Sequence, residues 1–200
     1  MKRGVAIVGG FGLVFAATLA RADGANSFFS SYGVNPPEAS RITYCHGYGC
    51  AFRTRLGFSS GEIGRLGSIM SGGRASPAAE RAAISHAVQW FEKKAGREAG
   101  TSTDKAKLGA MGGDPTQLDC IDEASNTTSL LVLMEKRGLL RHHTVLAPRT
   151  RGFLLDFRYP HNAAVIEEKK GGERWVVDSW PRANGEKPDI MKLETWLASS

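Results

Sequence analysis

The stretch that decides the fold of the C-terminal half reads HNAAVIEEKKGGERWVVD, residues 161–178. Two apolar runs, 161–166 and 174–178, lie on either side of a Lys-Lys-Gly-Gly sequence. Runs rich in β-branched residues around a Gly-containing turn are typical of an antiparallel β-hairpin. We therefore predict two paired strands here, with the turn at residues 169–172.

The register of this hairpin decides where its polar side chains lie. If Glu168 faces Glu173 across a four-residue loop, the numbers of paired residues sum to 341 and His161 faces Trp180. Asp178 is then a diagonal neighbour of His161 on the same face, within reach of its side chain. A loop with an odd number of residues would place the two on opposite faces. With an even loop, the sequence allows a carboxylate–imidazole pair in which Asp178 orients His161.

A helix is predicted from about residue 120 to residue 137. Its apolar face consists of Ala124, Leu130, Leu131, Leu133 and Met134, and it ends at a Lys-Arg-Gly sequence. Cys120 lies at the helix start, where free N–H groups and the positive end of the helix dipole favour a thiolate. Three acidic neighbours, Asp119, Asp122 and Glu123, oppose this effect because negative charge favours the neutral thiol. A nucleophile in this position needs a base or ion-pair partner, which histidine usually supplies.

The rest of the chain predicts further helices and strands. Residues 42–58 indicate one or two short strands around a Cys-Gly turn, and 60–70 a short helix. Ser76 and Pro77 start a second helix that is expected to end near Lys93, Lys94 and Gly96. Residues 144–147 and 152–157 are strand-like, and 23–40 indicate a loosely ordered lead-in. Since helices precede an antiparallel sheet, the predicted fold class is α+β.

The three cysteines point to one disulfide and one free thiol. Cys45 and Cys50 flank a segment with two glycines, which allow a turn tight enough to bring the sulfur atoms together. A Cys45–Cys50 disulfide is therefore predicted. The alternatives are two small buried residues, or half of a metal site completed by His46. If Cys45 and Cys50 pair, Cys120 remains free.

The N-terminus indicates export. Lys2 and Arg3 precede an apolar stretch, and Ala20-Arg21-Ala22 matches the small-x-small pattern of a signal peptidase site. We predict a signal peptide at residues 1–22 and one domain at 23–200, with a helical N-terminal part at about 60–110. The alternative is an uncleaved N-terminal anchor. The product is expected in the periplasm or secreted, without stable membrane insertion after cleavage.

Charge and metal-ligand patterns exclude some function classes. The formal charge of +6 falls to +3 when the three basic residues of the signal are removed, and no basic stripe with interleaved aromatic residues remains. Nucleic acid is therefore not an expected partner. His142 and His143 are adjacent, so in a strand they point to opposite faces and make a poor shared metal site. We predict no metal and no cofactor.

The order of these residues resembles that of a known superfamily. A Cys at a helix start, a His on a strand 41 residues later and an Asp on the next strand, 17 residues further on, resembles transglutaminase-like and bacterial transglutaminase-like cysteine peptidase domains. The local strings LDCIDEA, from Leu118, and WVVDSW, from Trp175, are also similar to these families. The resemblance covers about residues 115–181. It implies a papain-like core in which a nucleophile helix packs on an antiparallel sheet.

The same resemblance implies a chemistry. Cys120 would be the nucleophile, His161 the general base and acid, and Asp178 the orienting carboxylate of a reaction through an acyl-thioester. The substrate would be a protein or peptide, including peptides of peptidoglycan. The backbone N–H of Cys120 is the expected first oxyanion donor, and Gln117 or Trp90 a second, although papain-type enzymes carry a Gln farther upstream of the Cys.

Two alternatives stay open at this stage. An NlpC/P60-like cell-wall peptidase shares the Asp-Cys pair, but its third group is commonly a His, so Asp178 favours the transglutaminase-like interpretation. The other alternative is a catalytically inactive envelope binding module with the same fold. The reactivity of the Cys120 thiol distinguishes that module from an enzyme.

Overall fold

The computed structural model describes residues 25–107, 112–152 and 160–199. The predicted signal peptide at 1–22 and most of the strand-like run at 152–157 lie outside the described residues. In the described part of the chain, no helix has the length and apolarity that crossing a membrane requires.

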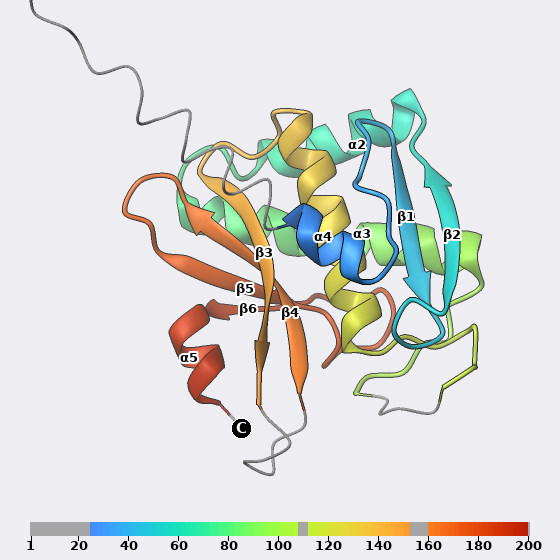
Figure 1. Cartoon of the computed structure of the whole chain (residues 1–200). Helices are drawn as coiled ribbons and strands as arrows, with labels where there is room; N and C mark the ends of the chain where they lie inside the picture. Colours follow the sequence, from blue (N-terminus) through green and yellow to red (C-terminus); the bar gives the residue numbers. More distant parts are fainter. Residues whose placement is uncertain (1–24, 108–111, 153–159, 200) are drawn as a thin grey trace, which may run out of the picture.

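The C-terminal half forms a four-stranded antiparallel sheet in the order β3-β4-β5-β6 (Figure 1). Its strands are β3 (His143–Arg151), β4 (His161–Glu168), β5 (Arg174–Asp178) and β6 (Asp189–Lys192). Between β4 and β5, Ala164 pairs with Val177 and Glu167 with Arg174, which is the predicted sum of 341. The predicted hairpin and its register are therefore confirmed.

The N-terminal half contains a second hairpin and two helices. The strands β1 (Arg41–His46) and β2 (Phe52–Gly57) pair antiparallel, as expected for residues 42–58. Helix α2 (Ser60–Ser71) begins with a capping box between Ser59 and Glu62, which satisfies backbone donors that the first turn leaves free. Helix α3 (Pro77–Ala99) begins at the predicted Ser-Pro sequence.

The predicted end of α3 near residue 96 is wrong. The helix continues through Gly96 to Ala99 and ends at Gly100, which has the left-handed φ of 79° typical of a helix terminator. Gly96 does not terminate the helix but allows a close contact, since a Cβ there would lie 2.8 Å from the side chain of Asn184. The glycine at position 96 is therefore explained by a close tertiary contact and not by the end of a helix.

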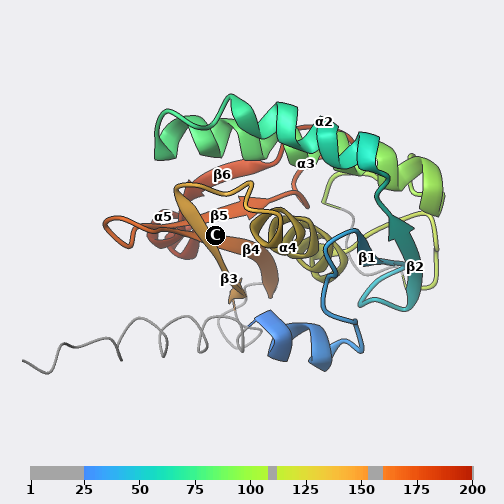
Figure 2. The ribbon, with the colours of Figure 1, turned by 90° about the horizontal axis from the view of Figure 1, so that it is seen from above.

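Helix α4 (Cys120–Lys136) confirms the helix predicted at about residues 120–137, and it is the central element of the fold. It lies between the β1–β2 hairpin and the four-stranded sheet (Figure 1), and α2 and α3 run side by side across the molecule (Figure 2). One face of the sheet, including Ala164, Ile166 and Val177, shares the main core with α3 and α4. The opposite face, including Ala163, Val165 and Val176, packs against α5 (Leu193–Ala198).

The lead-in at residues 23–40 is more ordered than expected. Residues 25–31 are helical, and Phe29 and Val34 are buried in a small cluster with Cys45 and Cys50. Figure 2 shows this helical segment on the side of α4 opposite α2 and α3. Phe28 and Phe29 were the apolar signal within a Gly- and Ser-rich stretch. Helices and antiparallel sheets together confirm the α+β class.

Candidate active site

The free thiol of Cys120 lies at the start of β4. Its Sγ is 3.8 Å from the carbonyl oxygen of Pro160, and the side-chain Nδ2 of Asn162 lies 4.0 Å from it. The cysteine is 4% exposed and is the first residue of α4. Residues far apart in the chain therefore meet here, and the thiol touches both neighbours of His161.

His161 and Asp178 form the predicted pair. His161 Nε2 lies 2.7 Å from Asp178 Oδ2, and both side chains are buried. Because a carboxylate only accepts hydrogen bonds, Nε2 carries the proton and Nδ1 is left as an acceptor in the neutral ring. This arrangement is the one in which His161 can take a proton at Nδ1.

Two tryptophans surround the imidazole. The ring of Trp180 lies 4.7 Å from that of His161 between centroids, and the ring of Trp196 lies 5.5 Å away. Trp196 also donates a hydrogen bond of 2.8 Å from Nε1 to Asp178 Oδ2. The pair therefore sits in an apolar, aromatic environment, which strengthens its hydrogen bonds.

Two polar atoms of this pair are buried without a partner in the described part of the chain. They are His161 Nδ1 and Asp178 Oδ1. Leaving a buried polar atom unpaired costs about 1–3 kcal/mol, so such atoms are rare in folded proteins and call for an explanation. One explanation for the unpaired His161 Nδ1 is that this nitrogen accepts a proton during a reaction.

The thiol and the imidazole approach from different sides of the sheet. By strand alternation His161 and Asp178 lie on the α5 face, whereas Asn162 lies on the face that packs against α4. Among the described contacts, no hydrogen bond joins Cys120 Sγ to the His161 ring. The structure therefore brings His161 and Asp178 together, and places Cys120 beside them without a direct bond.

The pKa of the Cys120 thiol is raised above its ordinary value. Burial is the largest cause, and the charges of Asp119 and Asp178 act in the same direction, while donors from Asn162 lower the pKa. The lowering that the helix start alone would give is thus outweighed. The resting thiol is neutral at neutral pH, so attack would require removal of its proton.

The predicted disulfide is confirmed: Cys45 and Cys50 are bonded, and Cys120 is free. The bond closes a loop in which residues 47–50 all have positive φ. With Asp122, the two sulfurs are the group of ligand-type atoms that lies within metal-binding distance in the described residues, but the disulfide occupies both sulfurs. The ring of His46 instead contacts Pro115 O and Thr54 Oγ1.

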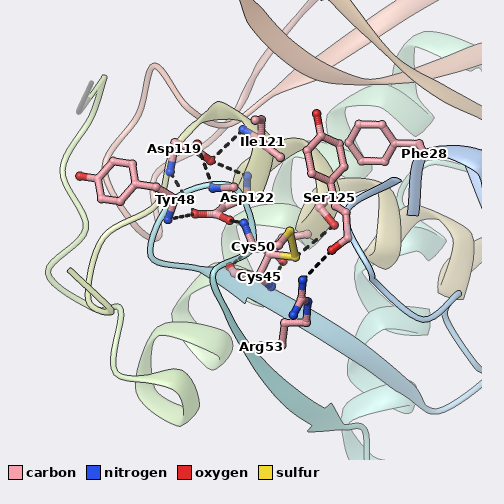
Figure 3. The surroundings of a disulfide bond; sticks show 12 residues. Phe28, Cys45, Tyr48, Cys50, Arg53, Asp119, Ile121, Asp122 and Ser125 are labelled. Atoms are coloured by element: carbon pink, nitrogen blue, oxygen red, sulfur yellow. Dashed lines mark hydrogen bonds between the residues drawn. A yellow bond between two sulfur atoms is a disulfide. The ribbon is translucent and has the colours of Figure 1, made fainter. Parts of the chain in front are cut away.

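This disulfide loop caps the start of α4 (Figure 3). Tyr48 N and Cys50 N donate to the carboxylate of Asp122, at 2.8 and 2.6 Å, and Gly49 N donates to Asp119 at 3.0 Å. Asp119 is also the N-cap of α4 and accepts from two of its backbone N–H groups. The carboxylates of Asp119 and Asp122 are therefore held by backbone donors of the disulfide loop and of the first turn of α4.

The two candidate side-chain oxyanion donors, Gln117 and Trp90, have other partners. Gln117 is buried, and its Nε2 donates to Thr103 O and Thr116 Oγ1 while its Oε1 accepts from Lys105 N. These bonds give the amide a structural role in the preceding loop. Trp90 packs against Phe58 and lines a cavity between α2 and α3.

The adjacent histidines also have separate partners. His143 Nδ1 contacts Glu80 Oε2 at 2.8 Å, and His142 Nε2 contacts Arg74 O at 3.0 Å. The two rings therefore do not share a site.

Sequence reasoning missed two residues of this site. Asn162 is held by Thr150, whose hydroxyl donates to its Oδ1 at 2.6 Å, so that Nδ2 faces the thiol. The sequence signal for Asn162 was its position directly after His161, because neighbouring residues in a strand lie on opposite faces. Trp196 had no local signal, since its role depends on how α5 folds back on the sheet.

Comparisons with known proteins add no assignment. No protein-family model, no curated protein and no solved structure matches this chain.

Proposed function

We propose that this protein is an exported cysteine hydrolase or acyltransferase of the transglutaminase-like, papain-like kind, acting on amide bonds of proteins or peptides. The observation that carries the proposal is the buried hydrogen bond between His161 and Asp178, which leaves His161 Nδ1 without a partner in the described part of the chain. The free thiol of Cys120 contacts the two residues that flank His161, Pro160 and Asn162. Order and spacing of Cys120, His161 and Asp178 support the same conclusion.

The raised thiol pKa defines the first step. Since Cys120 is neutral at rest, His161 Nδ1 takes the thiol proton as the sulfur attacks the substrate carbonyl, rather than beforehand. Because His161 and Cys120 lie on different faces of the sheet, the start of β4 has to turn so that Nδ1 reaches Sγ. The resulting imidazolium remains bonded to Asp178, which stabilises its charge.

The remaining steps follow from proton balance. The imidazolium gives its proton to the leaving amine, the C–N bond breaks and an acyl-thioester forms on Cys120. Water then completes hydrolysis, or a primary amine completes transfer, and His161 again moves the proton. Asn162 Nδ2, which is fixed by Thr150, lies 4.0 Å from the sulfur and is our candidate donor to the oxyanion that forms on the substrate carbonyl.

A variant series tests the proposal. Turnover of casein peptides and of peptidoglycan stem peptides, with and without a primary amine, is measured by mass spectrometry, together with trapping of an acyl-enzyme. Cys120→Ser and His161→Gln should each lower turnover by at least about 10³-fold, and the double variant should be hardly worse. The exposed histidine variant His86→Gln is the control and should keep full activity. Unchanged turnover in His161→Gln would disprove the mechanism.

A second candidate is the non-catalytic binding module. The 4% exposure of Cys120 and its raised pKa favour an inert, buried thiol. A module would form no acyl-enzyme with any of these peptides, and its peptide binding would be the same in Cys120→Ser. An enzyme would show the acyl adduct on Cys120 in the wild type alone.

A further inference from the structure

One oxygen of Asp178 accepts two hydrogen bonds, from His161 Nε2 at 2.7 Å and from Trp196 Nε1 at 2.8 Å. We infer that Trp196 is a positioning residue, whose indole N–H fixes the Asp178 carboxylate in the orientation that holds His161. The catalytic meaning of this role rests on the proposed function, but the role itself concerns only the His161–Asp178 pair.

Burial makes this bond obligatory. Trp196 is 1% exposed and packs in the apolar cluster on the α5 face with Leu193 and Val176. A buried indole has one donor and needs one acceptor. Asp178 Oδ2 supplies it, while Oδ1 has no partner in the described part of the chain. Without the indole, the bond from His161 would be the one side-chain hydrogen bond left to the carboxylate among the described contacts, and Asp178 would be free to turn together with the ring.

The indole is in turn fixed by the end of β3. The guanidinium of Arg151 lies 4.6 Å from the Trp196 ring centroid, within cation–π range. It also donates to Trp196 O at 2.9 Å and to Ser199 O at 3.0 Å, which holds the end of α5. Arg151 also pairs with His161 between β3 and β4. The contacts therefore link His161 to Arg151, Arg151 to Trp196, and Trp196 to the Asp178 carboxylate that binds His161.

The decisive variant is Trp196→Phe, which keeps an aromatic ring and removes the donor. The measurement is the Nε2–H resonance of His161 in protein labelled with ¹⁵N-histidine. Loss of one hydrogen bond to the carboxylate should speed solvent exchange of this proton about tenfold and shift its resonance. Trp90→Phe on α3 is the matched control and should leave the resonance unchanged. Far-UV circular dichroism checks the fold of both.

A second variant keeps the inference testable if Trp196→Phe does not fold. Arg151→Met retains the long side chain over the ring but loses its charge and donors. It should move the same resonance in the same direction by a smaller amount, on the order of twofold to threefold. If the His161 proton exchanges at the wild-type rate in folded Trp196→Phe, or in Arg151→Met when only that variant folds, the positioning role is disproved.

The outcome is separable from that of the proposed function. With an identified substrate, faster exchange together with a lower kcat at unchanged KM supports both. Faster exchange with unchanged turnover supports the role of Trp196 and contradicts the Cys-His-Asp mechanism. Unchanged exchange contradicts the role of Trp196 whatever the turnover.

Discussion

Two buried aspartates, Asp122 and Asp178, lie near the same cysteine and differ in their hydrogen-bond partners. Asp122 accepts backbone N–H groups at both oxygens, from Cys50 at Oδ1 and from Tyr48 and Asp119 at Oδ2. Asp178 accepts two side-chain donors at Oδ2 and none at Oδ1 among the described residues. Both are almost fully inaccessible to water.

This difference in hydrogen bonding distinguishes a carboxylate with a structural role from one that is suited to a reaction. A carboxylate whose two oxygens both accept hydrogen bonds from backbone groups fixes a loop to a helix. A carboxylate that binds an imidazole while buried polar atoms of the pair lack hydrogen bonds lowers the stability of the fold. Proteins commonly accept such a loss at sites where a reaction occurs. The disulfide loop therefore supports the start of α4, and the region of His161 is the candidate for chemistry.

The largest effect is expected from Asp122→Asn. One oxygen becomes an NH₂ group that faces a backbone N–H, so a strong acceptor is lost and a donor is left buried. We expect the free energy of unfolding to fall by about 3 kcal/mol, measured by urea denaturation. Asp114→Asn in an exposed turn is the control. Wild-type stability in Asp122→Asn would show that the loop does not depend on this carboxylate.

Loss of the disulfide should have the next largest effect. The bond joins residues five apart, and the loop-entropy relation gives about 2 kcal/mol for so short a loop. The double variant Cys45→Ser with Cys50→Ser should be destabilised by this amount in thermal or urea unfolding. Because both sulfurs are buried, a dithiol reductant should leave the native wild type intact. Rapid reduction of the folded protein would contradict the buried position of the bond.

Stability should also fall as the pH rises. Burial raises the pKa of Glu92 to about 8 and that of Asp104 to about 7, and it raises the pKa of Glu123. The folded protein therefore retains protons that the unfolded chain releases above about pH 4, so the stabilisation is complete at low pH and is lost through about pH 8.

This dependence is measurable between pH 5 and pH 8. The free energy of unfolding should fall by at least about 1.4 kcal/mol, the linkage value of one pKa unit on a single group. Glu92→Gln removes one of the titrating groups and should flatten the curve, with most of its stabilising effect at pH 8. A stability that rises over this range would contradict the burial of these carboxyl groups as acids.

Much of the fold was predictable because its signals are local. The His161–Asp178 pairing followed from an even-length turn, which the sequence left open against an odd one and which the register of β4 and β5 confirms. The Cys45–Cys50 bond followed from spacing. The helical residues 25–31 were missed because their composition indicated a loop, although Phe29 is buried against the disulfide. The end of α3 was missed because Gly96 serves a tertiary contact.

The site was predictable only in part. The order of Cys120, His161 and Asp178 predicted the pair, but not the face of the sheet from which the thiol approaches. The thiol pKa depends on burial, which no local pattern gives, so the expected effect of the helix start was outweighed. Trp196 was out of reach, because its contact with Asp178 depends on the packing of α5.

The smallest effect on stability is expected from Asp178→Asn. This variant tests most directly whether the carboxylates of Asp122 and Asp178 have different roles. An asparagine can keep its carbonyl oxygen at the Oδ2 position, where it still accepts from His161 and Trp196, and place its NH₂ group at the Oδ1 position, where no bond is lost. We expect a loss of less than about 1 kcal/mol, against about 3 kcal/mol for the same change at Asp122. Turnover should nevertheless fall by at least about 100-fold, because the imidazolium loses its counter-charge. Both variants are measured side by side by urea denaturation and by peptide turnover. Equal destabilisation at the two positions would show that Asp178 is another structural carboxylate, and the unpaired Nδ1 of His161 would then lose its functional explanation.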